Sequence, residues 1–183
     1  MLNGLLGSFS TGVAPVTTSY VSIQTATVDS GGASTITFSS IPSTYTHLQI
    51  RGLSFSTSAQ TDILMRFNSD SSSTYTLHQL YGDGSSAASS SNVPRTSILA
   101  GMAGNTPTTN GGVTIIDILD YTNTNKYTTV RSLQGNDVNG ATGYVLFRSG
   151  LWRDTSAITD ITFTLSAGSL TQYSQFALYG IKA

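Results

Sequence analysis

The chain has 183 residues, a formal net charge of −1, and charged side chains at only 9% of its positions. Serine and threonine each occur 28 times, whereas glutamate and cysteine are absent. This composition argues against a helical protein, whose surface normally carries Glu and Lys, and against a nucleic-acid-binding protein, which needs a basic surface. The lack of cysteine excludes disulfide scaffolds, thiolate zinc sites and thiol catalysis.

Short runs of β-branched and aromatic residues, a composition typical of strands, recur along most of the chain. In chain order they cover residues 20–28, 35–40, 46–55, 61–68, 74–82, 95–102, 113–121, 126–134, 144–152, 158–165 and 174–182. Apolar side chains alternate within these runs, as at Ile63, Met65 and Phe67, so one face of each strand should be buried. The run 113–121 is the most apolar and predicts a central strand.

Three polar segments between these runs predict loops. They are residues 83–93, 103–112 and 135–143. Two glycines predict irregular strands. The alternation slips at Gly52, after which Leu53 and Phe55 form the apolar pair, and such a slip predicts a β-bulge. Gly150 predicts a break in the strand 144–152.

Ten or eleven short strands with no helical stripe predict an all-β fold, an antiparallel β-sandwich of the jelly-roll type. Residues 19–183 would form this single domain, and residues 1–18 an extended N-terminal arm outside it. The side chains that carry the alternation should form the core: Ile36, Phe38, Leu48, Ile50, Ile63, Met65, Phe67, Ile116, Ile118, Phe163 and Leu165.

The chain offers few groups for catalysis, and we expect no enzymatic activity, cofactor or metal ion. His47 and His78 are the only imidazoles that could serve as a base in nucleophilic hydrolysis, and a histidine within a strand is more often structural. Carboxylates for glycoside cleavage could come from Asp117, Asp120, Asp137, Asp154 and Asp160. Calcium could use residues 83–86 or 117–125, although Asp and Asn there more often form turns.

Trp152 is the only tryptophan and a possible ligand contact. At the rim of a sandwich an exposed tryptophan could stack on a sugar. The alternative is a core or interface aromatic, because large aromatic side chains dominate buried contacts. The Ser-rich segment 83–93 also has two interpretations: it is either a flexible loop or a surface that contacts a partner.

The N-terminal arm carries large apolar side chains that would be exposed if the arm remained free. They include Leu2, Leu5, Leu6 and Phe9. We expect these residues to be buried on another chain, with strand addition supplying backbone hydrogen bonds, since side-chain burial alone does not offset the ordering of so many residues. The arm has no basic region and is interrupted by glycines, so we expect neither a signal peptide nor a membrane span.

Two stretches resemble a recurrent pattern in small virion proteins of tailed bacteriophages. Residues 17–52 read TTSYVSIQTATVDSGGASTITFSSIPSTYTHLQIRG, and residues 66–86 read RFNSDSSSTYTLHQLYGDGSS. The opening NGLLGS and the ending FALYGIK are similar to the same family. The resemblance implies a tail-fibre, tail-tip or head-decoration component, and it carries over no catalytic residue.

These observations predict a non-enzymatic structural protein of the virion, assembled in the host cytoplasm and attached to the particle through its arm. Its partners would be copies of itself, in a homotrimer, and other virion proteins, with neither nucleic acid nor membrane insertion. Low surface charge and abundant hydroxyl groups favour such a permanent assembly. The alternative is a carbohydrate-binding module that recognises host-surface glycans through an aromatic platform.

Overall fold

A computed structural model describes residues 19–58, 60–105, 110–137 and 143–182. These residues form twelve strands and no helix, so no helix among them could cross a membrane. The strands are β1 (Tyr20–Thr27), β2 (Thr35–Phe38), β3 (His47–Ser54), β4 (Thr61–Phe67), β5 (Tyr75–Gly82), β6 (Ala87–Arg95), β7 (Ile98–Ala103), β8 (Gly112–Ile118), β9 (Thr128–Asp137), β10 (Gly143–Trp152), β11 (Ile161–Leu165) and β12 (Gln175–Ile181).

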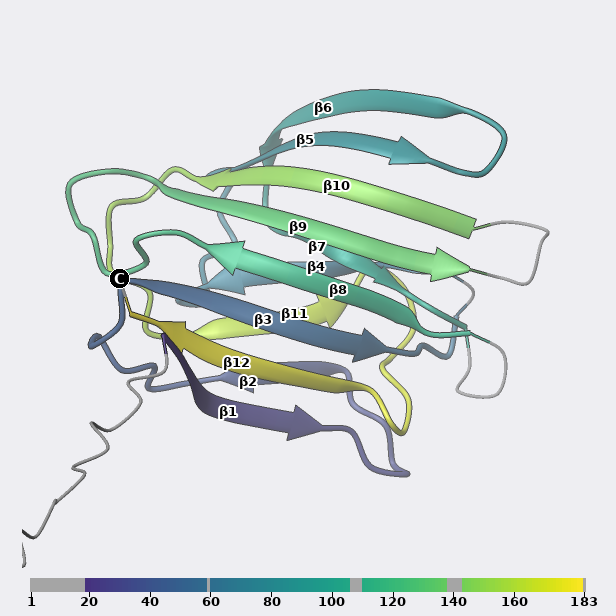
Figure 1. Ribbon diagram of the computed structural model, residues 1–183, viewed down its shortest axis with the longest axis horizontal. Helices are drawn as coiled ribbons and strands as arrows, with labels where there is room; N and C mark the ends of the chain where they lie inside the picture. Colours follow the sequence, from purple (N-terminus) through teal and green to yellow (C-terminus); the bar gives the residue numbers. More distant parts are fainter. Residues whose placement is uncertain (1–18, 59, 106–109, 138–142, 183) are drawn as a thin grey trace, which may run out of the picture.

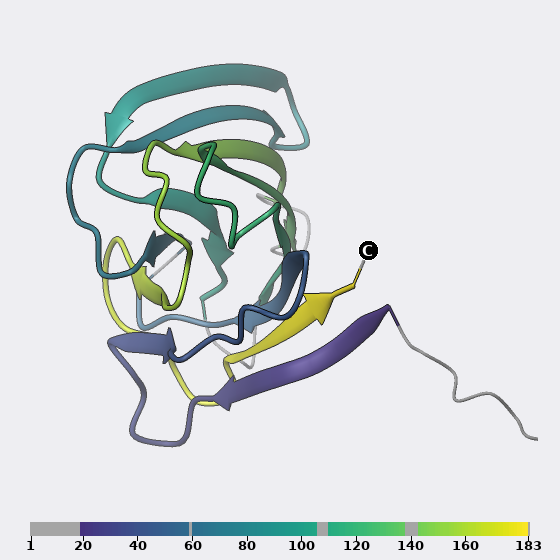
Figure 2. The same ribbon diagram turned by 90° about the vertical axis from the view of Figure 1, so that its left-hand side faces the viewer.

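The strands form two sheets packed as a sandwich (Figure 1). The larger sheet has eight strands in the order β1-β12-β3-β8-β9-β10-β5-β6, and the smaller has four in the order β2-β11-β4-β7. Every neighbouring pair is antiparallel. Seen along the sandwich, β1 and β6 lie at opposite edges of the larger sheet (Figure 2). The predicted antiparallel sandwich is confirmed.

The topology also follows the predicted jelly roll. When the hairpin β5–β6 and the strands β9 and β10 are set aside, the remaining sheets are β1-β12-β3-β8 and β2-β11-β4-β7. This strand order, in which the chain passes repeatedly between the two sheets, is that of two interlocked Greek keys. The two extra strand pairs widen the larger sheet, and therefore widen the outer surface of the protein.

The core lies between the two sheets and matches the predicted alternation. Ten of the eleven side chains expected there are buried, and Leu165 is partly buried against them. Aromatic rings fill the centre, where Phe163 lies edge-on to Phe38 and stacks on Phe176. Burial of side chains of this size contributes about 1.5–3 kcal/mol each, so this layer provides much of the stability of the fold.

The Ser-rich segment is not the predicted loop, because residues from Ala87 onward form strand β6. Most of its side chains are exposed, so the strand shows no apolar alternation and its sequence gives no sign of pairing. Backbone hydrogen bonds to β5 hold it instead. The turn before it is fixed by Asp83, whose carboxylate accepts the N–H groups of Ser85 and Ser86 at 2.9 and 2.7 Å.

The two predicted glycine irregularities are also wrong. Strand β3 pairs in register through Gly52, and β10 runs as one strand through Gly150 in continuous pairing with β9, although its pairing with β5 passes from Ser149 directly to Trp152. Both glycines instead allow a close approach. A Cβ at Gly52 would lie 2.8 Å from the Phe176 ring, and a Cβ at Gly150 would lie 2.5 Å from Cδ1 of Ile98. Because β3 has no bulge, Leu53 keeps its place on the outer side of the sheet.

Candidate interaction surface

Large apolar side chains gather on the outer side of the eight-stranded sheet. Seven of the twelve that are exposed in the described chain lie there, with exposed fractions between 38% and 63%. They form what we call the apolar face: Leu53, Leu80, Val113, Ile115, Leu133, Val145 and Phe147. Soluble monomers rarely expose a contiguous apolar patch of this kind, so such a patch marks an interaction site.

The sheet register makes the apolar face continuous. One row crosses the sheet through the pairs Ile115–Leu133, Leu133–Phe147 and Phe147–Leu80. The neighbouring row runs from Leu53 through Val113 and Gly135 to Val145. Directly paired side chains lie about 4.5–5.5 Å apart, so the two rows form one surface that spans five strands.

A depression of about 330 Å³ lies within the apolar face. Val113, Ile115, Leu133 and Val145 line it, together with Gly135. A Cβ added at Gly135 would have no atom within 4 Å, so the glycine leaves the centre of the depression open. The surface therefore has both the chemistry and the shape to receive apolar side chains.

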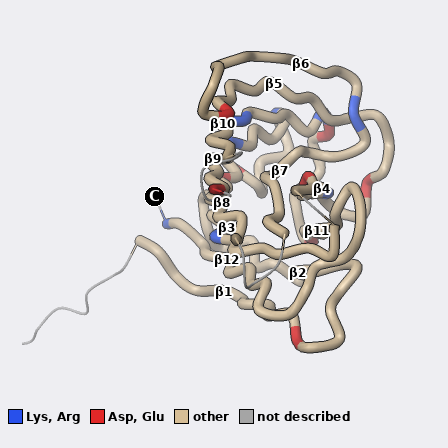
Figure 3. The backbone as a smooth tube through the Cα atoms, turned by 90° about the vertical axis from the view of Figure 1, so that its right-hand side faces the viewer, with Lys and Arg blue, Asp and Glu red and all other residues tan. Residues whose placement is uncertain are grey.

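Hydrogen-bonded polar groups border the apolar face on one side. Gln49 Nε2 donates to Asp117 at 2.9 Å, and Arg131 Nη2 donates to the same carboxylate at 2.6 Å. Arg51 Nε donates to Gln49 at 3.1 Å, and its guanidinium lies 5.7 Å from the centre of the Tyr179 ring. We call these five residues the polar ridge. Elsewhere charges are sparse along the described backbone (Figure 3).

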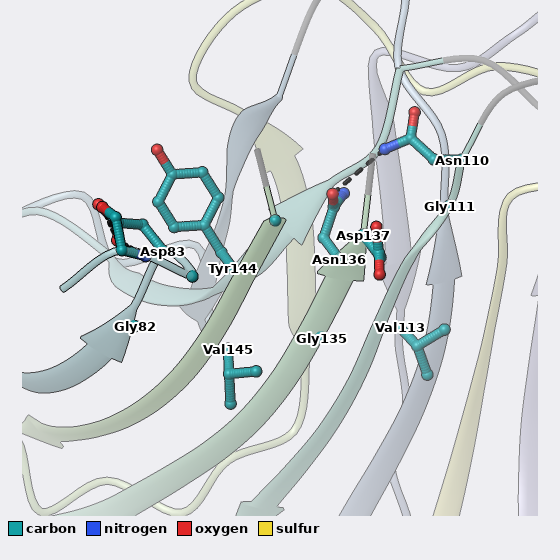
Figure 4. Close-up of a pocket in the computed structure, with 13 residues that line it drawn as sticks. Gly82, Asp83, Asn110, Gly111, Val113, Gly135, Asn136, Asp137, Tyr144 and Val145 are labelled. Atoms are coloured by element: carbon teal, nitrogen blue, oxygen red, sulfur yellow. Dashed lines mark hydrogen bonds between the residues drawn. The ribbon is translucent and has the colours of Figure 1, made fainter. Parts of the chain in front are cut away.

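The apolar face leads, at the other side, into an open pocket of about 1000 Å³ (Figure 4). The pocket shares Val113, Gly135 and Val145 with the depression, and glycines, Tyr144 and polar side chains form its remaining walls. Asn136 Oδ1 accepts hydrogen bonds from Gln60 Nε2 at 2.9 Å and from Asn110 Nδ2 at 3.2 Å. This amide cluster joins the ends of β9 and β8 to the segment before β4, and thus shapes the end of the sheet.

The two histidines do not form the base of a hydrolytic triad. His47 Nδ1 lies 3.2 Å from a carboxylate oxygen of Asp120, but the same nitrogen accepts the backbone N–H of Asp120 at 2.9 Å. In that tautomer Nδ1 is the acceptor and Nε2 carries the proton, whereas a triad needs the reverse arrangement. His78 lies exposed on β5, in register with Ser91 of β6.

The carboxylates considered for calcium have protein partners. Asp120 pairs with Lys126, and Asp117 belongs to the polar ridge. At Asp83 the backbone N–H groups of Ser86 and Ser85 lower the pKa to about 2. No cluster of three or more His, Asp or Glu residues that could hold a metal ion occurs in the described ranges.

Trp152 is buried, with 1% of its surface exposed, so of the two alternatives it is the core aromatic, and its ring is not exposed to stack on a sugar. Its ring packs against those of Phe67 and Tyr75, at centroid distances of 5.4 and 6.4 Å, and these two rings also pack against each other. A tryptophan at the end of a strand can point either way, and here the alternation of β10 turns it inward. The aromatic platform for a sugar is therefore absent at this position.

The four arm residues Leu2, Leu5, Leu6 and Phe9 lie outside the described residues.

The apolar face was not predicted from the sequence, although the composition of one strand indicates it. Val113, Ile115, Ile116 and Ile118 make β8 apolar on both sides, which predicts either a doubly buried strand or a strand whose outer side meets a partner.

Comparison of the chain with protein-family models, with curated proteins and with solved structures found no match.

Proposed function

We propose that the protein is a non-enzymatic structural subunit of a tailed-bacteriophage particle, of the tail-fibre or head-decoration kind. In this proposal the subunit forms homo-oligomers, most simply trimers, and its N-terminal arm, residues 1–18, attaches it to the particle by binding to other chains there, copies of the subunit included. One observation supports self-association above all, namely the apolar face on the outer side of the eight-stranded sheet. The assignment to a phage particle rests on the sequence resemblance.

The apolar face favours a permanent partner over a transient one. Interfaces that form once and persist are more apolar than transient ones and resemble a domain core cut in half. Here seven apolar side chains occupy five adjacent strands, and the charged groups of the polar ridge lie to one side. Binding would thus proceed by apolar burial and shape, as a structural role requires.

Glycan binding, the alternative function, loses its main support, because Trp152, the aromatic side chain expected to stack on a sugar, is buried.

The oligomeric state tests the self-association directly. Light scattering of the purified full-length chain should give a trimer, and a monomer at high micromolar concentration would contradict the proposal.

Two matched variants connect the oligomer to the apolar face. Leu133→Lys places a charge at its centre and should weaken association, whereas Leu119→Lys places the same charge at an exposed leucine outside the apolar face and should not. The phage assignment has its own test. The protein should be found in purified particles of the phage that encodes it, and its absence from them would refute that assignment.

A further inference from the structure

We propose that residues 2–13 of the N-terminal arm of a neighbouring copy cover the apolar face in the assembled protein. This inference rests on the proposed function, because it names the segment that the self-associating surface would bind. Three observations on the chain support it: the composition of the arm, the point at which the arm leaves the sheet, and the position of the polar ridge.

The composition of the arm matches the surface. Residues 1–18 contain no charged side chain, and their apolar residues include Leu2, Leu5, Leu6 and Phe9. A segment with charges would lose their hydration on the apolar face without gaining a partner, whereas this segment has none to lose. Its glycines at positions 4, 7 and 12 allow the backbone to lie close to a flat sheet.

The arm begins where it can reach a neighbouring copy. The carbonyl of Ser19 accepts the N–H of Lys182 at 2.9 Å, which fixes the start of the domain beside the first residue of β1. Strand β1 is an edge of the larger sheet, four strands from β9, or about 19 Å at normal strand spacing. Eighteen residues can span up to about 60 Å when extended. The arm therefore has ample length to leave its own domain.

The polar ridge favours a neighbouring copy over the same chain. Tyr20 pairs with Ile181, and Ile181 pairs with His47, so β1 starts at the His47 end of the sheet. The polar ridge lies between that end and the apolar face, since the Asp117–Arg131 pair precedes Ile115–Leu133 in the register. An arm that folded back would have to cover these charges. An arm that arrives from another subunit can approach from the open pocket and avoid them.

Symmetry supports the same choice. An arm and a sheet face are two different surfaces, so their contact is head-to-tail and can close into a ring such as a trimer. Two apolar faces packed on each other would instead give a two-fold dimer. A reciprocal exchange of arms would give a dimer and a cyclic exchange the proposed trimer, so this one kind of contact is sufficient to build the proposed assembly.

Engineered disulfides test the proposal in the full-length chain, which has no cysteine of its own. Chains with Leu133→Cys are mixed, through a cycle of unfolding and refolding, with tagged chains that carry Leu2→Cys, Leu5→Cys, Leu6→Cys or Phe9→Cys. The tag separates mixed disulfides from the other products by mass. The matched control replaces Leu133→Cys by Leu119→Cys, at an exposed leucine outside the apolar face.

At least one arm position should form the mixed disulfide with Leu133→Cys on the order of tenfold faster than with Leu119→Cys, because docking raises the local thiol concentration. A disulfide that forms only within one chain, in variants with both substitutions, would overturn the choice of a neighbouring copy. An oligomer with no such crosslink at any arm position would overturn the arm as the occupant and leave the proposed function intact. A monomer by light scattering would refute the proposed self-association and this inference together.

Gly135→Val gives a second, independent readout. The substitution adds apolar surface but fills the open centre of the depression. If arm side chains occupy the depression, the yield of the arm crosslink should fall. An unchanged yield would show that the arm does not lie there, and would overturn this placement.

Discussion

Trp152 Nε1 donates a hydrogen bond of 2.7 Å to a carboxylate oxygen of Asp70, which connects the last residue of β10 to the turn between β4 and β5. The same carboxylate accepts the N–H of Ser72 at 2.8 Å and the hydroxyl of Thr74 at 2.6 Å. The hydroxyl of Tyr75 donates to the carbonyl of Asp70 at 3.1 Å. The turn is therefore fastened to the aromatic core, and the only tryptophan is a structural residue.

Replacing Trp152 by phenylalanine keeps an aromatic ring in the core but removes the N–H that Asp70 accepts. We expect the free energy of unfolding to fall by about 1.5–3 kcal/mol, the usual range for a hydrogen bond to a charged group. Chemical denaturation followed by circular dichroism measures this change. Tyr127→Phe, at an exposed ring, is the control and should have no effect. Equal stability of the two variants would contradict the structural role of the indole N–H.

Acid stability should depend on Asp70. Partial burial raises the pKa of its carboxyl, but hydrogen bonds from Ser72, Thr74 and Trp152 outweigh burial and hold the pKa well below its usual value. Because the pKa is lower in the folded state, the contribution to stability is full above the unfolded value of about 3.9 and is lost as the pH falls towards the folded value. Asp70→Asn should flatten this loss between pH 4 and 2, roughly the window in which the unfolded carboxyl takes up its proton.

Unfolding curves of the wild type and of Asp70→Asn, recorded at several pH values, measure this effect. Asp83→Asn is a useful comparison, because the pKa of Asp83 is also lowered but its turn lies at an exposed hairpin. Parallel pH curves for the wild type and Asp70→Asn would contradict the prediction.

Arg148 joins the two sheets from the inner side of β10 and is only 5% exposed. It donates to the carbonyl of Gly101 at 3.0 Å and to Asp62 at 2.9 Å, both on the smaller sheet. Arg148→Met should lower the free energy of unfolding by about 1–3 kcal/mol, since it removes the buried hydrogen bond to Gly101 and the partly buried one to Asp62. Arg131→Met is the control, because that ion pair is exposed and should contribute about 0–1 kcal/mol. Thermal and chemical unfolding of both variants test the difference.

Even the substitution of Gly150 by alanine should lower the stability of the fold. An added Cβ would lie 2.5 Å from Cδ1 of Ile98 and 3.1 Å from the carbonyl of Thr76. Gly150→Ala should therefore cost about 1–3 kcal/mol by overpacking. Ile98→Val removes the nearest atom, so the same change should cost less in that background. Four denaturation curves complete the cycle, and equal costs in both backgrounds would show that Ile98 is not the obstacle.

Deletion of residues 1–14 should leave a folded domain that no longer associates. The first strand begins at Tyr20, and the buried core of the described chain begins at Val28. The truncated chain should keep the strand-rich circular dichroism spectrum and the cooperative unfolding of the full chain, but should be a monomer by light scattering. A truncated chain that fails to fold would place the arm within the domain, and one that still forms the oligomer would exclude the arm as its link.

The sequence was sufficient for the fold class and the core, because alternation reports directly which side of a strand is buried. It was insufficient where backbone pairing acts alone, as in β6, whose side chains are mostly exposed. Gly52 and Gly150 were misread for a related reason. A glycine can mark a bulge, a break or a close approach, and only the neighbouring chain decides between them.

The apolar face was beyond the sequence analysis for a different physical reason. Alternation identifies the buried side only of a strand whose other side is polar, whereas β8 is apolar on both sides. Leu133 and Val145 are far apart in sequence and become neighbours only through strand pairing. Val145 of β10 pairs with Gly135 of β9, two residues from Leu133, and both side chains lie on the outer side of the sheet. Leu53 was paired with Phe55 on the apolar side of its strand through a predicted bulge that does not exist. A surface that is built by strands distant in sequence depends on the strand order of the sheet, which alternation does not report.

Four of the seven side chains of the apolar face belong to the strands that interrupt the jelly-roll order, β5, β9 and β10. Lengthening or shortening these strands would change the width of the docking surface while the order of the remaining strands stayed the same. Because the two sides of a strand are chemically independent, outward substitutions there could also change the partner without repacking the core. The choice of binding partner and the folding of the chain are thus encoded at separate positions, so one can be redesigned while the other is held constant.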